Sequence, residues 1–107
     1  MIRIAQVLFA ATFLLLSTAV AADTFTGTIT DTMCKSDHTA MKVTPESKCV
    51  RECVKYGAKY ALLVGKNVYT LSDQETPAKF AAQKVTVTGV LDPNTRVLKV
   101  QKIQPVK

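Results

Sequence analysis

Hydrophobic and polar positions alternate strictly over residues 23–31, whose sequence is DTFTGTITD. Phe25, Gly27 and Ile29 fall on one side of this segment, and four threonines fall on the other. A period of two with many β-branched residues predicts a half-buried strand. Four further segments carry a strand signal and are separated by turns or a short helix: 59–64, 67–71, 84–91 and 96–103.

A helical period interrupts these strands between residues 44 and 57. Cys49, Val50, Cys53 and Val54 are spaced so that they share one side of a helix, and charged residues occupy the other side. Thr44-Pro45 is a typical helix start, and Gly57 stands where a left-handed C-terminal cap is expected. Thr76-Pro77 repeats the start signal and predicts a second, short helix over residues 78–83.

The order of these elements predicts a mainly β fold. Five short strands, with a Cys-bearing helix between strands 1 and 2 and a short helix between strands 3 and 4, match an OB-like Greek-key barrel. A small SH3-like barrel is the alternative. In the OB fold the loop after strand 1 is a common binding loop, and here that connection carries every cysteine and the only histidine.

The N-terminus predicts export. Arg3 precedes a long uncharged stretch, and Ala19-Val20-Ala21 fits the small-residue site at which a leader is cleaved. We therefore expect a secretory signal peptide at residues 1–21 and a single OB-like domain at residues 22–107, in a periplasmic or secreted protein. An uncleaved membrane anchor is the alternative; after cleavage we expect no stable insertion in the membrane.

Composition narrows the class of function. The chain has 107 residues and a formal net charge of +6, which suits one small basic domain. An exported protein seldom meets nucleic acid, so we expect no nucleic acid partner and instead an envelope protein or a small ligand. We also expect no enzyme, because the sequence lacks a nucleophile elbow, a Cys-x-x-Cys motif, paired carboxylates and a glycine-rich phosphate loop.

The cysteines and the histidine form two pairs with the same spacing, Cys34-x3-His38 and Cys49-x3-Cys53. On a helix, residues four apart lie on one face, so the two side chains of a pair can converge on one ion. Three cysteines and one histidine are a normal ligand set for zinc, and thiolates also suit copper(I). The set Cys34, His38, Cys49 and Cys53 is therefore a candidate site for zinc or copper.

A disulfide is the competing interpretation, because exported thiols tend to oxidise. Cys49 and Cys53 lie too far apart on a helix to bridge, which leaves a bond from Cys34 to either Cys49 or Cys53. The first expectation is thus a non-catalytic binding module that such a disulfide staples. A metal-binding envelope protein is the alternative, and a thiol-redox or thiol-reactive protein that uses the unpaired cysteine is the second alternative.

Three runs carry a resemblance: residues 29–34 (ITDTMC), 49–60 (CVRECVKYGAKY) and 84–89 (KVTVTG). Together they resemble a group of small exported bacterial proteins of unknown function with an OB-like barrel. The resemblance implies the compartment and the fold and carries no activity. The Cys-x3-Cys spacing with a distant histidine is also similar to the copper site of Sco-type copper chaperones, but only in its ligand chemistry.

Overall fold

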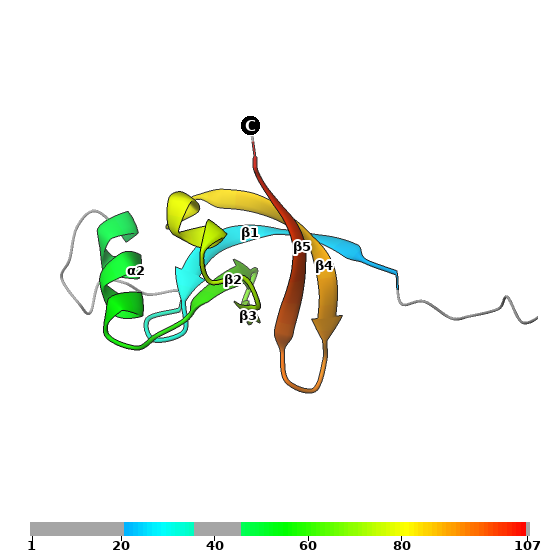
Figure 1. The fold of residues 1–107 in the computed structure, drawn as a ribbon, viewed down its shortest axis with the longest axis horizontal. Helices are drawn as coiled ribbons and strands as arrows, with labels where there is room; N and C mark the ends of the chain where they lie inside the picture. Colours follow the sequence, from blue (N-terminus) through cyan, green and yellow to red (C-terminus); the bar gives the residue numbers. More distant parts are fainter. Residues whose placement is uncertain (1–20, 36–45, 107) are drawn as a thin grey trace, which may run out of the picture.

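The computed structural model describes residues 21–35 and 46–106. Their elements lie close to the predicted ones (Figure 1). The strands are β1 (Asp23–Asp31), β2 (Tyr60–Val64), β3 (Asn67–Leu71), β4 (Lys84–Asp92) and β5 (Val97–Pro105). The helices are α2 (Glu46–Lys55) and the 3-10 helix η3 (Thr76–Phe80). Within these residues the fold is mainly β, with five strands, one α-helix and one 3-10 helix, and the order of strands and helices is the predicted one.

Each strand pairs with two others, in the order β1-β2-β3-β5-β4, and β4 returns to β1. Four of the pairs are antiparallel, and β3 with β5 is parallel. β1 pairs with two strands along different parts of its length. Asp23 to Thr28 pair with β4, and Thr28 to Asp31 pair with β2. β1 thus passes from one partner to the other near Gly27 and Thr28.

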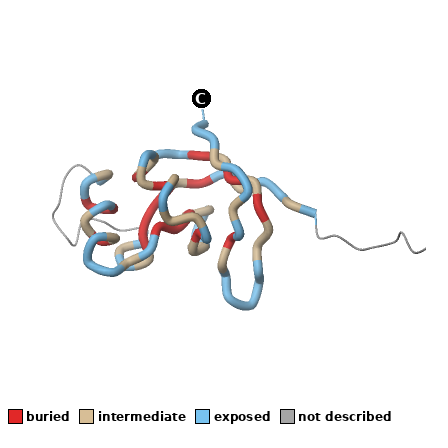
Figure 2. The backbone as a smooth tube through the Cα atoms, viewed as in Figure 1, coloured by how far each residue is buried: buried red, intermediate tan, exposed pale blue. Residues whose placement is uncertain are grey.

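The core lies inside this ring of strands. Buried residues alternate along β4, as period-two patterning requires, and the buried parts of the chain are red in Figure 2. The largest fully buried apolar side chains of the strands come from β1, β2, β3, β4 and β5: Ile29, Leu62, Leu71, Val85, Val87 and Leu98. Helix α2 adds Val50 to the same cluster, which fixes one face of the helix against the sheet.

Helix α2 is amphipathic in the predicted sense. Cys49, Val50 and Cys53 are its buried residues, whereas Lys48, Arg51 and Lys55 are exposed. Arg51 donates a hydrogen bond from Nε to the carbonyl of Ala78, so the outer face of α2 is tied to η3. The expected start of the helix at Thr44-Pro45 lies outside the described residues.

Gly57 ends α2 in the predicted manner. Its φ of 114° lies in a region that side-chain-bearing residues rarely adopt. The N–H of Gly57 donates to the carbonyl of Val54, and the N–H of Ala58 donates to the carbonyl of Cys53. This pair of bonds is a Schellman cap, which satisfies carbonyls that the helix itself leaves without partners.

We expect Gly57→Ala to lower the free energy of unfolding by about 1–2 kcal/mol, the usual penalty for a Cβ at positive φ. A Cβ at Gly57 meets no atom within 4 Å, so the whole effect comes from the backbone. Urea denaturation followed by circular dichroism measures it. An alanine variant as stable as the parent would show that this cap is dispensable.

The short second helix departs from the sequence-based expectation. It spans Thr76–Phe80 as a 3-10 helix, not residues 78–83. Thr76 is not its cap. The carboxylate of Asp73 instead accepts the N–H groups of Glu75 and Thr76 at 2.9 and 3.0 Å, so the turn begins earlier. These hydrogen bonds to Thr76 and Glu75 outweigh the burial of Asp73 and lower the pKa of its carboxyl group.

The last strand also extends further than expected, because β5 continues through Pro105 rather than stopping at residue 103. Neither helix within the described ranges has the length and apolar character that a membrane span requires.

Candidate metal centre

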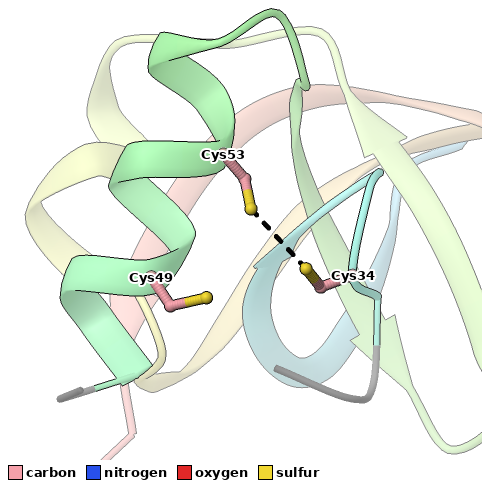
Figure 3. Close-up of side chains that lie close together, drawn as sticks. All are labelled: Cys34, Cys49 and Cys53. Carbon is pink, nitrogen blue, oxygen red and sulfur yellow. Dashed lines mark hydrogen bonds between the residues drawn. The ribbon is translucent and has the colours of Figure 1, made fainter. Parts of the chain in front are cut away.

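The three cysteines gather at one place between α2 and the turn that follows β1. Their sulfur atoms all lie within 4.8 Å of one another. Figure 3 shows Cys49 and Cys53 pointing from successive turns of α2 toward Cys34, which faces them from the other side. Residues that are 15 and 19 positions apart in the sequence therefore form one sulfur cluster.

Cys34 is positioned by a buried carboxylate. Asp31, the last residue of β1, is fully buried, and its Oδ1 accepts the N–H groups of Met33 and Cys34, each at 2.8 Å. The N–H of Lys35 donates to the carbonyl of Asp31 at 3.1 Å, and the hydroxyl of Thr30 donates to the carbonyl of Lys35. This turn of residues 32–35 folds the chain back so that the Cys34 thiol faces α2.

Cys49 and Cys53 owe their position to the helix period and to the cap. A spacing of four residues places both side chains on one face, and the burial of Val50 turns that face toward the sheet. The Schellman cap holds the carbonyl of Cys53. Beyond it, the N–H of Thr32 donates to the carbonyl of Lys59, and the N–H of Lys59 donates to the Thr32 hydroxyl. The end of α2 and the Cys34 turn are thereby joined.

Burial differs among the three thiols. Cys49 and Cys53 are 0% and 1% exposed, whereas Cys34 is half-buried. Burial raises the pKa of Cys49, and its neighbours Cys34 and Asp31 act in the same direction. Burial also raises the pKa of Cys53 from its usual 9.0 to about 12, helped by its hydrogen bond with Cys34. The two helix thiols are therefore neutral near pH 7.

We expect the stability of the reduced, metal-free protein to fall as the pH rises from about 9 to about 12. A thiol whose pKa is higher in the folded chain favours folding at pH values below its unfolded-state pKa. That contribution disappears as the pH passes through the folded pKa of about 12. Denaturation curves over this range measure the effect. Cys53→Ala removes the Cys53 contribution, so equal slopes for parent and variant would contradict the assignment.

The expected disulfide remains a prediction. No disulfide joins the three cysteines in the structure, and the sulfur atoms of Cys34 and Cys53 are 3.6 Å apart, against about 2.05 Å in a disulfide. Of the four residues in the predicted metal set, the structure brings Cys34, Cys49 and Cys53 together. His38, the fourth, lies outside the described residues.

One residue of the site has no counterpart in the sequence analysis. Asp31 appears there only as the last residue of the segment 23–31, but its side chain builds the turn that presents Cys34. The signal that could have identified it is local. An aspartate at a strand end, two and three residues before the N–H groups that it accepts, is typical of an Asx turn.

Comparisons with protein families, with curated proteins and with solved structures give no match to this chain. The ligand chemistry of the cysteine cluster therefore follows from its own geometry.

Proposed function

We propose that this protein is a small, non-catalytic module that binds a thiolate-preferring metal ion, copper(I) or zinc, through Cys34, Cys49 and Cys53. The observation that carries the proposal is the convergence of three sulfur atoms within 4.8 Å of one another. Sulfur ligands favour copper(I) and zinc over hard cations such as calcium and magnesium.

The two metals make different demands on the chain. Zinc is almost always four-coordinate in structural sites, so three thiolates leave one position for another ligand. His38 is the predicted donor for that position. Copper(I) is a soft monovalent ion whose coordination is satisfied by two or three sulfur atoms, so the three cysteines suffice for it.

The chain's own residues prepare the site by excluding water and by holding protons. The raised pKa values of Cys49 and Cys53 mean that both thiols release protons when they coordinate as thiolates. The half-buried Cys34 offers the accessible side of the cluster. Metal affinity is therefore expected to increase with pH over the neutral range.

We also propose a fold and a location for the protein that carries this site. We infer an OB-like Greek-key barrel, an interpretation supported by the closed order of strand pairs and by the parallel pair of β3 and β5. The signal peptide at residues 1–21, the single domain at 22–107 and a periplasmic or secreted location rest on the sequence. In that compartment an envelope protein or a small ligand is the expected partner.

A disulfide-stapled binding module is the second candidate. The 3.6 Å contact between the sulfur atoms of Cys34 and Cys53 supports it, because a small side-chain rotation separates this contact from a bond. Cys49 is then the remaining thiol, and it is completely buried. Such burial disfavours the third candidate, a thiol-reactive protein that uses the unpaired cysteine, because reactive thiols need access and a lowered pKa.

Intact mass spectrometry tests the proposal. The protein is purified from the cell envelope without reductant and weighed under native and then denaturing conditions. A native mass excess that matches one copper or zinc ion, with a fully protonated denatured mass, supports the metal site. A denatured mass two hydrogens lighter, with no metal in the native spectrum, contradicts it and supports the stapled module. His38→Ala separates zinc, which loses a ligand, from copper.

We expect Asp31→Ala to weaken metal binding by about 10–100-fold, the usual effect of losing a group that orients a metal ligand. The alanine removes the acceptor that fixes the Met33 and Cys34 N–H groups. Asp31→Asn is the matched control because it keeps an oxygen at the same position. Competition with a chromogenic chelator measures both affinities, and equal losses in the two variants would argue against positioning through this oxygen.

A further inference from the structure

A hollow lies beside β3, next to the turn that presents Cys34. It has a volume of about 360 Å³ and opens to solvent. Its lining comes from three places: the turn after β1, strand β3 with the turn before it, and the residue that precedes β5. The lining residues are Thr32, Lys35, Lys66, Val68, Thr70 and Arg96.

The lining is strongly basic. Lys35, Lys66 and Arg96 bring three positive charges to one hollow, and none of the described residues that line it is acidic. Lys66, Val68 and Thr70 alternate along the chain, so they share one side of the β3 hairpin. The N–H of Thr70 donates to the carbonyl of Arg96 at 3.1 Å, which holds Arg96 beside the end of β3.

Arg96 is oriented by its neighbours. One of its terminal nitrogens donates to Oδ1 of Asn67 at 3.1 Å, and its guanidinium carbon lies 5.1 Å from the centre of the Tyr69 ring. A guanidinium carries five N–H donors, so these contacts leave donors for a ligand. The Thr32 hydroxyl accepts the N–H of Lys59 and keeps its own hydrogen to donate.

Two of the three cations also sit on unfavourable backbone. Lys35 and Arg96 have φ values of 55° and 62°, and only one other residue with a side chain, Ala82, has a positive φ among the described residues. Glycine or asparagine would relieve such positions. Both residues close turns, because the N–H of Lys35 donates to the carbonyl of Asp31 and the N–H of Arg96 donates to the carbonyl of Asp92.

We propose that this hollow, which we call the basic hollow, binds the phosphate group of an anionic ligand. The hollow offers five donor groups: three cationic side chains and the hydroxyls of Thr32 and Thr70. A carboxylate has only two oxygens, whose acceptor positions lie in one plane, so it cannot engage all five groups. A phosphate has three oxygens spread over a wider solid angle, and cations with hydroxyl donors are its usual protein partners. The phosphate is a terminal one with three free oxygens, and it can belong to a soluble molecule or to a lipid headgroup.

The test uses inorganic pyrophosphate as the soluble probe and the reduced, metal-free protein. Titration is followed by the backbone amide resonances in nuclear magnetic resonance spectra. We expect saturable shifts at residues 32–35, 66–70 and 96. The double variant Lys66→Gln/Arg96→Gln should weaken binding at least tenfold. The matched control, Lys84→Gln/Lys102→Gln, removes the same charge from exposed positions of β4 and β5 and should change affinity less than twofold.

A further variant separates loss of the cation from loss of the fold. Arg96→Gly removes the cation while relieving the positive φ, so the protein should stay folded and still lose affinity. Flotation with vesicles of phosphatidylcholine, with and without phosphatidic acid, separates the sources. Binding to phosphatidic acid vesicles that the Lys66/Arg96 variant loses assigns the phosphate to a headgroup, and binding to pyrophosphate alone assigns it to a soluble ligand. Binding to neither probe, or equal losses in the two double variants, overturns the proposal.

Discussion

Cys49→Ser and Cys53→Ser are each expected to weaken metal binding by more than about 100-fold and to abolish one-to-one binding at micromolar protein. Loss of a group that merely supports a ligand weakens binding 10–100-fold, so loss of the ligand itself should exceed that range. Serine keeps the shape of cysteine but offers a hydroxyl, which is a poor ligand for a soft ion. Chelator competition and native mass spectrometry measure affinity and stoichiometry.

The control for these variants is Lys48→Ser, which changes an exposed residue of the same helix and should bind metal as the parent does. Circular dichroism checks that each serine variant retains its fold. Parent-like affinity in a folded Cys53→Ser variant would contradict the three-sulfur site, because it would show that Cys53 is not a ligand.

Gly27→Val is expected to produce the largest loss of stability, about 3 kcal/mol or more. A Cβ at Gly27 would lie 2.2 Å from the carbonyl oxygen of Leu63 and 2.9 Å from its carbon. Both atoms belong to the backbone of β2, so no side-chain rotation can relieve the clash. The strands would have to separate where β1 passes from β4 to β2. A small domain with a total stability of roughly 5–10 kcal/mol should then be partly unfolded at 37 °C.

Urea denaturation measures this effect, and Thr26→Val is the matched control. It places the same side chain one residue earlier on an exposed position of β1, removes the 3.2 Å hydrogen bond between the Thr26 and Thr86 hydroxyls, and should change stability by about 1 kcal/mol or less. If Gly27→Val were as stable as Thr26→Val, β1 and β2 would not approach each other as closely as the structure indicates.

Much of the secondary structure could be predicted from the sequence because it depends on local periods. The threonines of 24–30 and the apolar residues between them define β1, and the spacing of Cys49 and Cys53 defines the inner face of α2. The capping of η3 could not be predicted in the same way. Thr76-Pro77 is a good helix start in isolation, but the carboxylate of Asp73 accepts the N–H groups of Glu75 and Thr76, and the turn therefore begins earlier.

The candidate site, too, could be predicted from the sequence only in part. The common face of Cys49 and Cys53 follows from a four-residue spacing. Their approach to Cys34 depends on Asp31 and on the two hydrogen bonds between Thr32 and Lys59, which join segments 27 residues apart. The close approach of Gly27 to Leu63 is also a property of strand register. Register and long-range contact depend on the whole fold, so the local pattern around each residue does not reveal them.

The double pairing of β1 has a consequence for the order in which the chain can fold. Thr26 lies opposite Thr86, so the first strand cannot complete its contacts until β4 has been synthesised. Non-local pairing of this kind slows folding, because a long loop must close before the contacts form. A chain emerging from the ribosome therefore stays largely unfolded until its last quarter appears. If residues 1–21 direct export as proposed, this delay suits a chain that crosses a membrane in an extended state.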